Sequence, residues 1–387
     1  MILNNLKLAG SDEPVSIRVV DNKIADISGP AMNDTADGHA INFDGAIVFP
    51  GLINSHDHLD FNIFPQFAGK FYSNYTEWGK YIHINYKDEI AAISRIPAML
   101  RSEWGVFKNL LCGVTTVVNH GESSGLKDDL ISIFEGSQCL HSVHFERSWK
   151  LKLNNPFNKR IPVNVHVGEG DDWLSFSEIE KLAWWNLLKR KLIGVHAVAM
   201  SESQAKKFAA VVWCPQSNYF LLDKTAPVNL LIKHTNILFG TDSTLTSNWD
   251  IWEHLRVARR TRLLSDGELY QSLNQNAAKV WKLNRGEIAT GKDADLVVAR
   301  VKKGTAGFDS FFLVSPADLL LVMHKGNVRL FDEILLPRLK DIDINNFSKI
   351  YVGNSCKYVQ GNLPVLIEQI REYYPAATFP VSTTIPV

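Results

Sequence analysis

The sequence is poor in cysteine and has no excess of charge of either sign. Its only four cysteines are Cys112, Cys139, Cys214 and Cys356. They are scattered and form no CxxC pair, which argues against a disulfide framework and against a cysteine-ligated zinc site. Forty-one basic residues balance forty-one acidic ones, so no overall electric field favours nucleic acid or an anionic membrane. We therefore expect neither as a partner.

Long apolar runs are also absent. No run reaches the length of about 20 residues that a membrane-spanning helix needs, and the first residues lack the apolar core of a signal peptide. The default expectation is a protein of the reducing cytoplasm. An apolar fraction of 45% is that of an ordinary globular protein. A chain of 387 residues is long enough for one large α/β barrel and a smaller domain.

Short apolar runs alternate with helical patterns through the middle of the chain, which predicts a parallel sheet. The expected strands are 47–54, 114–119, 142–145, 163–167, 192–196, 210–214 and 237–240. The expected helices are 91–111, 127–135, 177–190, 202–208, 251–264 and 267–283.

The two ends of the chain have a different pattern. Val15, Ile17 and Val19 give the first segment one apolar face, and so short a β unit needs partner strands. Residues 286–301 and 319–330 again read as strand, turn and strand. The predicted organisation is therefore a small β-sandwich domain made from both ends, a barrel between them, and a tail with one helix at 364–374. The boundaries are 1–46 plus 286–345 for the β domain, 47–285 for the barrel, and 346–387 for the tail.

Two histidines follow the first apolar run of the middle region. His56 and His58 are two residues apart, so on an extended strand their imidazoles point the same way and can face one metal ion. The strand before them reads as buried on both faces. Its carboxyl end is where barrel enzymes place their chemistry. An isolated HxH in an exposed loop is the ordinary alternative, and only further ligands downstream reverse it.

Further ligand-type residues stand at the ends of later strands. His166 ends one run with Glu169 three residues on, His196 ends the next, and Asp242 follows the last. Each has an ordinary explanation alone, as a hydrogen-bonded histidine or a helix cap. Together they form an ordered set of imidazoles and carboxylates that suits zinc or ferrous iron. Such an ion lowers the pKa of bound water towards about 7, and nearby groups can move protons or polarise the group under attack.

These motifs resemble the amidohydrolase superfamily, and within it the cytosolic aminohydrolases and deaminases. The resemblance spans about residues 1–335 and lies in PGLINSHDH, HVGE, the strand-end His196, CPQSN at 214–218, FGTDS and GKDADLVV at 291–298. It implies a distorted (β/α)8 barrel with a small composite β-sandwich. It also implies a small-molecule substrate and allows a homodimer. The implied metal ligands are His56, His58, His166 and Asp242.

The resemblance also implies the roles of the remaining residues. Glu169 is the expected proton shuttle, His196 orients water or stabilises the tetrahedral intermediate, and Asp242 accepts the proton of the attacking water. No strand-end lysine stands where binuclear relatives carry one, so we expect one divalent ion per chain, zinc in the first place and Fe²⁺ as the other fitting ion. Only 16 positions separate Arg147 from Val163, so we also expect a missing or irregular strand near strand 4.

Five residues are candidates for substrate binding. Each has a structural alternative, because most such side chains serve packing, second contacts or the surface. Arg147 is a candidate because a guanidinium binds carboxylate or carbonyl oxygen. The full set is Glu77, Trp78, His120, Arg147 and Trp173.

The leading hypothesis is a metal-dependent hydrolase that deaminates an amino-substituted nitrogen heterocycle through metal-bound hydroxide. The HVGE spacing favours it, because Glu169 then lies beside the hydroxide and can protonate a ring nitrogen. Hydrolysis of a cyclic amide or imide C–N bond, as in imidazolonepropionase-like relatives, is the alternative. A catalytically silent binding scaffold is a third hypothesis. The H-x-E…P-C-x-x-C signature of zinc deaminases that act on nucleic acid is not completed here.

Overall fold

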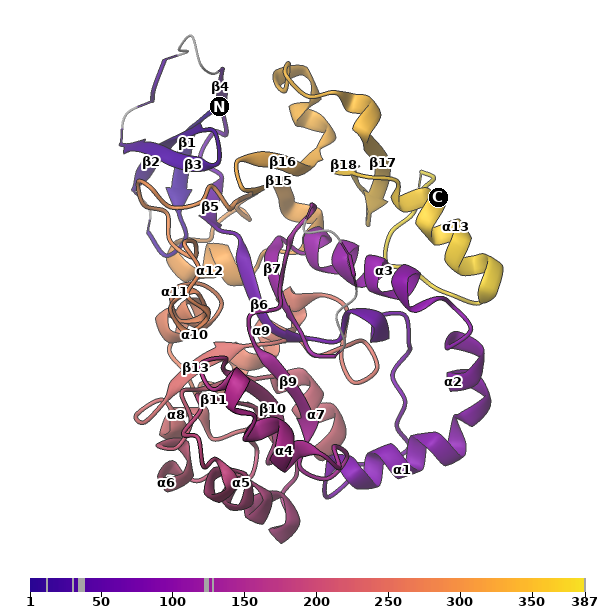
Figure 1. Cartoon of the computed structure of the whole chain (residues 1–387). Helices are drawn as coiled ribbons and strands as arrows, with labels where there is room; N and C mark the ends of the chain where they lie inside the picture. Colours follow the sequence, from indigo (N-terminus) through magenta and orange to yellow (C-terminus); the bar gives the residue numbers. More distant parts are fainter. Residues whose placement is uncertain (12, 30, 34–38, 122–124, 127–128, 386–387) are drawn as a thin grey trace.

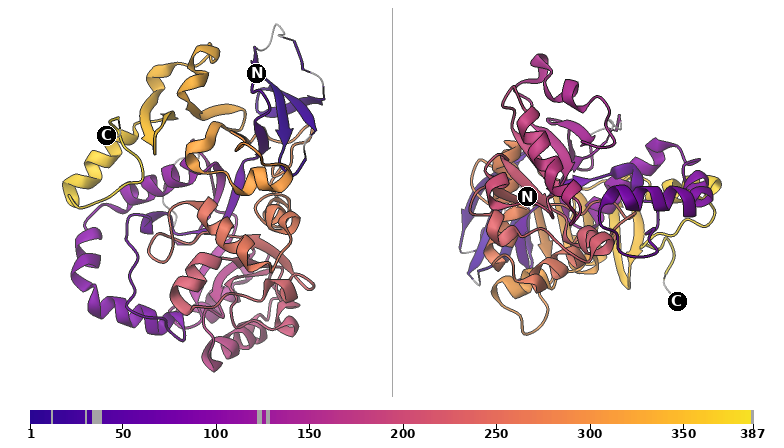
Figure 2. Two further views of the ribbon diagram at one scale, coloured as in Figure 1. Left: turned by 180° about the vertical axis from the view of Figure 1, so that it is seen from behind. Right: turned by 90° about the horizontal axis from the view of Figure 1, so that it is seen from below.

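The computed structural model describes the chain except residues 12, 30, 34–38, 122–124, 127–128 and 386–387. It is an α/β protein with one large sheet at one end and a set of parallel strands below it (Figure 1). The first and last parts of the chain lie at the same end of the molecule in both views of the long axis (Figure 2).

Strands from both ends of the chain form one sheet of ten strands. β5 (Ile47–Pro50) joins the two halves, because it runs parallel to β1 and antiparallel to β14. One apolar cluster then covers residues from both halves, including Val15, Ile17, Val298 and Met323. The other strands are β1 (Ile2–Leu8), β2 (Pro14–Val20), β3 (Lys23–Ser28), β4 (Ala40–Asn42), β14 (Leu296–Ala299), β15 (Leu319–His324), β16 (Asn327–Asp332), β17 (Phe347–Val352) and β18 (Ser355–Gln360).

Two sequence expectations about this sheet were wrong. The single strand expected at 47–54 is two strands, β5 and β6 (Leu52–Asp57). The strand is interrupted at Gly51. Only glycine fits there, because a Cβ would lie 2.2 Å from Oγ1 of Thr115. Residues 346–387 are more than a tail with one helix, because the β17–β18 hairpin pairs with β16 and extends the sheet before α13 (Leu363–Tyr373) begins.

The middle of the chain supplies eight strands whose neighbours pair in parallel. They form two ladders in chain order, β6 to β8 and β9 to β13. The backbone links β13 to β6 as well, because the N–H groups of Thr241 and Asp242 donate to the carbonyl oxygen of His56 at 3.1 and 3.0 Å. The remaining strands are β7 (Val114–Asn119), β8 (Ser132–Phe134), β9 (Gln138–Ser142), β10 (Val163–Val167), β11 (Leu192–His196), β12 (Ala210–Trp213) and β13 (Asn236–Phe239).

No strand is missing between β9 and β10. These two strands pair directly, with Gln138 opposite Val163, and the short interval between them holds only α4 (Trp149–Leu153) and one 3-10 turn. The strand that the sequence pattern missed is β8, inside the segment expected to be a helix at 127–135, of which residues 127 and 128 lie outside the described chain. Three residues are too few to show a strand's alternation.

Helices cover the outside of the parallel strands and the cavity at their carboxyl ends. α1 (Tyr75–Asn85) and α2 (Lys87–Ile93) stand away from the strands on one side (Figure 1). The others are α3 (Ala98–Leu111), α5 (Trp173–Trp185), α6 (Glu202–Ala205), α7 (Pro215–Leu222), α8 (Val228–Leu231), α9 (Ile251–Thr261), α10 (Asp266–Ser272), α11 (Gln275–Trp281) and α12 (Gly307–Phe312). Among the described residues, none of these helices has the length and apolar character needed to cross a membrane.

A buried aspartate fastens the large sheet to the parallel strands. Asp295 accepts hydrogen bonds from Oγ1 of Thr115 at 3.0 Å and from the backbone of Lys325 at 2.7 Å. It also pairs with Nη1 of Arg285 at 2.9 Å. Burial raises the pKa of this carboxyl, but His324 and Arg285 outweigh burial and hold the pKa below its usual value.

We predict that Asp295→Ala lowers the free energy of unfolding by about 3–5 kcal/mol, because the buried Arg285 loses the fully buried one of its two carboxylate partners and keeps the more exposed Asp293. Urea unfolding at neutral pH measures the loss. Asp266→Ala, which removes a half-exposed partner of Arg259, should cost about 1 kcal/mol or less. Because the folded pKa of Asp295 is depressed, its contribution is present above the unfolded pKa of about 3.9 and is lost as the pH falls through the lower folded value. Equal losses in the two variants would contradict the prediction.

Candidate metal centre and active site

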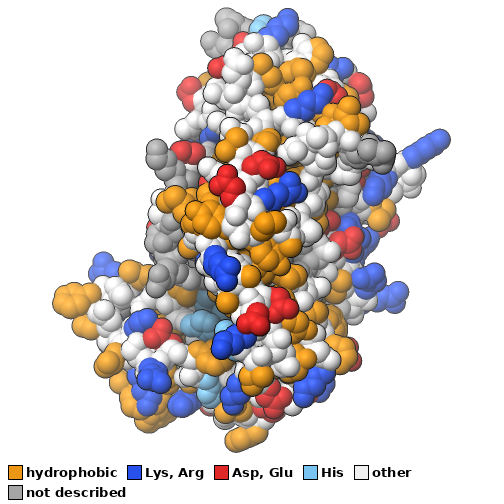
Figure 3. All heavy atoms as spheres, turned by 90° about the vertical axis from the view of Figure 1, so that its right-hand side faces the viewer, with side chains coloured by type: hydrophobic (Ala, Val, Ile, Leu, Met, Phe, Trp, Pro, Cys, Tyr) orange, Lys and Arg blue, Asp and Glu red, His pale blue; other side chains and the backbone are white. Residues whose placement is uncertain are grey.

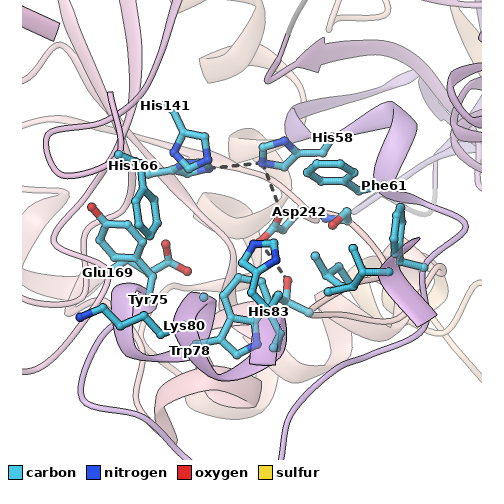
Figure 4. Close-up of a pocket in the computed structure, with 18 of the residues that line it drawn as sticks. His58, Phe61, Tyr75, Trp78, Lys80, His83, His141, His166, Glu169 and Asp242 are labelled. Atoms are coloured by element: carbon cyan, nitrogen blue, oxygen red, sulfur yellow. Dashed lines mark hydrogen bonds and ion pairs between the residues drawn. The ribbon is translucent and has the colours of Figure 1, made fainter. Parts of the chain in front are cut away.

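Six histidines gather where the parallel strands end. Each ring lies within 6.4 Å, centroid to centroid, of at least one other ring in the group. Figure 4 shows His58, His141 and His166 on one side of a cavity, with Asp242 and Glu169 facing the same space. The group is His56 and His58 on or just after β6, His120 just after β7, His141 on β9, His166 on β10 and His196 on β11.

The predicted ligands lie at the spacing of atoms around one ion. Nε2 of His166 is 3.1 Å from Nε2 of His56 and 3.4 Å from Nε2 of His58. Oδ1 of Asp242 is 3.8 Å from Nε2 of each of those two histidines. Neighbouring ligand atoms of a tetrahedral zinc ion, with bonds near 2.1 Å, are about 3.4 Å apart.

The chemistry of these donors also fits a cation. One N–H on His166 cannot point straight at both neighbouring nitrogens, whereas a cation between them meets all three lone pairs. Burial, and then the neighbouring histidines, hold the pKa of His56 and of His166 well below the usual value. The rings are therefore neutral near pH 7, which is the form that binds a metal.

Asp242 is held in place by three hydrogen bonds. The hydroxyls of Ser217 and Thr246 donate to its Oδ2 at 2.8 and 2.9 Å, and the backbone N–H of Ser243 donates to Oδ1 at 2.8 Å. Burial raises the pKa of this carboxyl, but His58, His196 and the Ser217 and Ser243 bonds together bring it below the usual value. Asp242 is thus an ionised carboxylate with a fixed orientation.

His196 is oriented by the segment that opens α7. Its Nδ1 lies 2.8 Å from Oδ1 of Asn218, so an Nδ1–H donates to that oxygen and Nε2 is left facing the site. Nε2 is 3.6 Å from Glu169 and 3.9 Å from Asp242. His196 and Asp242 have φ of 71° and 60°, a left-handed conformation that non-glycine residues rarely adopt and that concentrates at functional sites.

Glu169 is a buried carboxyl with a tendency to keep its proton. Its residue is 6% exposed. Burial raises its pKa well above the usual value, and the negative charges of Asp242 and Glu178 raise it further. A carboxyl of raised pKa holds its proton more readily than an exposed one and can donate it to a bound substrate, which suits a general acid–base group.

The cavity in front of these groups is mainly aromatic and aliphatic. Its volume is about 790 Å³, within the range of small-molecule sites. Histidine side chains are visible from outside, in a hollow of the face shown in Figure 3. The apolar wall comes from α1, α2 and nearby loops and includes Phe61, Phe64, Tyr75, Trp78, Ile82, Ile90, Phe145 and Leu245.

The structure brings together some of the predicted substrate-binding residues and leaves others outside. Trp78 lines the cavity, with its indole N–H bonded to the carbonyl of Phe67 at 2.7 Å. Glu77 does not line it; its carboxylate accepts from the backbone of Ser73, since successive helical residues point about 100° apart. Arg147 and Trp173 are exposed and are not among the residues that line this cavity.

Several residues of the site were not predicted. Ser217 and Asn218 belong to the CPQSN segment, which carried the resemblance but no assigned role. Tyr75 and His141 line the cavity, and neither was among the residues selected from the sequence. The position of His141 on β9 was hidden because the strand was expected four residues later, at 142–145.

Comparisons with known proteins agree with the motifs. The model of the amidohydrolase family matches residues 157–329. The chain is 23% identical over 355 residues to a 5'-deoxyadenosine deaminase of Methanothermobacter thermautotrophicus, covering 76% of this chain and 83% of that protein. It is 23% identical over 364 residues to a 5-methylthioadenosine/S-adenosylhomocysteine deaminase of Thermococcus sibiricus, covering 78% and 83%.

Solved structures share the fold. An adenosine deaminase from Xanthomonas campestris with bound zinc has a TM-score of 0.66 at 16% identity, over 96% of this chain and 98% of that one. The aminofutalosine deaminase of Helicobacter pylori has a TM-score of 0.60 at 16% identity, over 84% and 99%. The chain is thus similar to proteins of the amidohydrolase superfamily, in its aminohydrolase and deaminase branch. It is a hydrolase of C–N bonds other than peptide bonds.

We predict that His166→Ala lowers the bound metal from about one ion per chain to a small fraction of that, because it removes the nitrogen that faces both other histidines. Inductively coupled plasma mass spectrometry after gel filtration measures the content. His234→Ala, at a half-exposed histidine paired with Glu202, should keep the wild-type content. Full metal in the His166 variant would contradict the assignment, and two tightly held ions in the wild type would contradict a mononuclear centre.

Proposed function

We propose that this protein removes the amino group from an amino-substituted nitrogen heterocycle, with one divalent ion per chain held by His56, His58, His166 and Asp242. The observation that carries the proposal is the position of Glu169. It is a buried carboxyl of raised pKa, 3.6 Å from His196, at the polar end of an apolar cavity. Zinc is the proposed ion. When bound there, it supplies a Lewis acid that lowers the pKa of water from 15.7 towards about 7.

The residues then divide the proton transfers among themselves. Asp242 accepts a proton from the attacking water, because it is ionised and lies at the same place as the histidine ligands. Glu169 gives its proton to a ring nitrogen as the C–N carbon is attacked, which removes negative charge from the ring. Glu169 then takes the remaining proton of the added hydroxyl and gives it to the amine, which leaves as ammonia, and the proton held by Asp242 returns to Glu169 as the products depart. His196, held by Asn218, directs Nε2 at the same centre and stabilises the oxygen that develops charge.

The cavity favours a flat ring that carries an apolar substituent. Its wall offers aromatic faces from Phe61, Tyr75 and Trp78 for stacking. Isoleucines of α1 and α2 and Leu245 add aliphatic surface to the same wall. We therefore propose 6-aminopurine nucleosides with an apolar 5' group as the first substrates to test, in line with the names of the curated relatives.

Two features of the architecture belong to the same proposal. We infer that the strands from β6 to β13 close into a distorted (β/α)8 barrel, with β13 beside β6 as the observed backbone bonds support. We also infer that residues 1–46 and 286–345 act as one β-sandwich domain beside it, supported by the cluster that joins them.

The direct test is a screen for released ammonia with metal-loaded protein. The panel contains adenosine, 5'-deoxyadenosine, methylthioadenosine, amino-pyrimidines, amino-pterins and amino-triazines. We expect ammonia from at least one purine nucleoside, with faster turnover when the 5' position is apolar. Ring opening without ammonia would support the cyclic-amide alternative. No turnover of the panel by metal-loaded, folded protein would favour the silent scaffold.

We predict that Glu169→Gln lowers kcat by about 10²–10⁴-fold, the usual contribution of a general acid–base group. The amide has the same shape but cannot take up and return the proton. Metal content and melting temperature should stay at wild-type values, which separates a chemical defect from a structural one. Glu180→Gln, at an exposed carboxylate paired with Lys207, is the control and should turn over normally. A Glu169→Gln protein with full metal and near-normal kcat would remove Glu169 from the mechanism.

A further inference from the structure

His120 is a buried histidine whose two ring nitrogens find no hydrogen-bond partner among the described residues. Its residue is 1% exposed. Burying a polar group without a partner is unfavourable. The ring is therefore placed for something that the described residues do not supply.

Other buried histidines outside the cluster do find partners. His324 bonds Asp295 through Nδ1 and Ser132 through Nε2, at 3.1 and 3.3 Å. His254 bonds the carbonyl oxygen of Asn248 through Nε2 at 2.8 Å. His120 thus differs from an ordinary core histidine, which uses at least one ring nitrogen in a hydrogen bond.

The backbone holds His120 between the two histidines of β6. Its N–H donates to the carbonyl oxygen of Asp57 at 2.7 Å, and Asp57 is the residue between His56 and His58. Its ring centroid lies 4.1 Å from that of His166 and 4.9 Å from that of His56. This anchor leaves the side chain little freedom to point elsewhere.

Ligand atoms of His56, His120 and His166 lie within 4.8 Å of one another. Two of these three histidines belong to the ligand set of the proposed function. Atoms that share an ion with bonds near 2.1 Å are about 3.0–4.2 Å apart, so small rotations of the rings bring all three to one ion. His120 is not among the residues that line the main cavity, which makes direct contact with a substrate there a poorer explanation of its position.

We infer that His120 is a fifth protein ligand of the metal centre. The inference rests on the proposed function, because it concerns the same ion, and it goes further in setting the coordination number. Four imidazoles and a carboxylate are five protein ligands, one more than a tetrahedral ion accepts. They favour five-coordination, or six-coordination once water is added. Ions that accept five or six ligands readily, such as Fe²⁺ and Co²⁺, are then better suited than in a four-ligand centre.

The test counts ligands and does not use activity. X-ray absorption at the metal edge of the cobalt-loaded wild-type protein should give four imidazoles per ion, and His120→Asn should give three. The visible d–d bands of the His120→Asn protein should intensify, because a lower coordination number strengthens them. His254→Asn, which also alters a fully buried histidine but lies outside the cluster, should leave both signals unchanged.

Affinity gives a second readout. Loss of a group that only supports a ligand usually weakens metal binding by about 10–100-fold, so His120→Asn should weaken cobalt binding at least tenfold in competition with a chelator. Three imidazoles in the wild type would overturn the inference even if the variant failed to fold. Unchanged binding in His120→Asn, with the expected loss in His166→Ala, would overturn this inference alone. Unchanged binding in both variants would overturn the metal centre and with it the proposed function.

Discussion

The site depends on one constraint: buried imidazole nitrogens of three histidines face one another, and a single N–H on His166 cannot serve both of its neighbours. Nε2 of His166 lies within 3.4 Å of the same atom in both His56 and His58, and burial lowers the pKa of His56 and of His166, which keeps those two rings neutral. Lone pairs that converge in this way repel one another unless a cation lies between them. The carboxylate of Asp242 adds the negative charge that such a cation attracts. The surrounding structure holds these donors together before any ligand is bound.

Much of the fold serves that arrangement. Parallel neighbours from β6 to β13 bring strand ends that are far apart in the sequence to one edge. Gly240 allows the segment after β13 to lie close to β6, because a Cβ there would lie 2.8 Å from Cβ of His56. Beneath the site, Lys108 is buried and donates to Asp57 and Asn62 at 3.0 and 2.9 Å. This fixes Asp57, the residue between His56 and His58. The metal ligands are thus positioned from below by a hydrogen-bonded network.

The sequence was most informative where function depends on local pattern. His56, His58, His166, His196 and Asp242 each end an apolar run, so their meeting followed from parallel strands alone. Contacts that depend on tertiary packing could not be derived in that way: Asn218 of α7 supports His196 at the end of β11. β8 was missed because three residues carry no periodicity. A missing or irregular strand was therefore expected near strand 4, where β9 and β10 pair directly. Trp173 and Arg147 were chosen for their chemistry, but loop and helix orientation turned them to solvent.

Residue 120 illustrates what the structure adds to a family resemblance. The motifs placed this histidine at a strand end near the cavity, with substrate contact and a structural role about equally supported. Its unpaired nitrogens and its ring beside His166 indicate the metal instead. Two proteins with the same motif set can therefore differ in coordination number when one more strand end contributes a ligand.

In the proposed reaction, water replaces an amino group on a ring carbon. The most direct measurement is mass spectrometry of the product formed in ¹⁸O-labelled water, combined with ammonia quantification in the same reaction. Deamination predicts one ¹⁸O atom in the product, an intact ring and one ammonia per turnover. A product that has gained a whole water molecule with its ring opened, and no free ammonia, would contradict it.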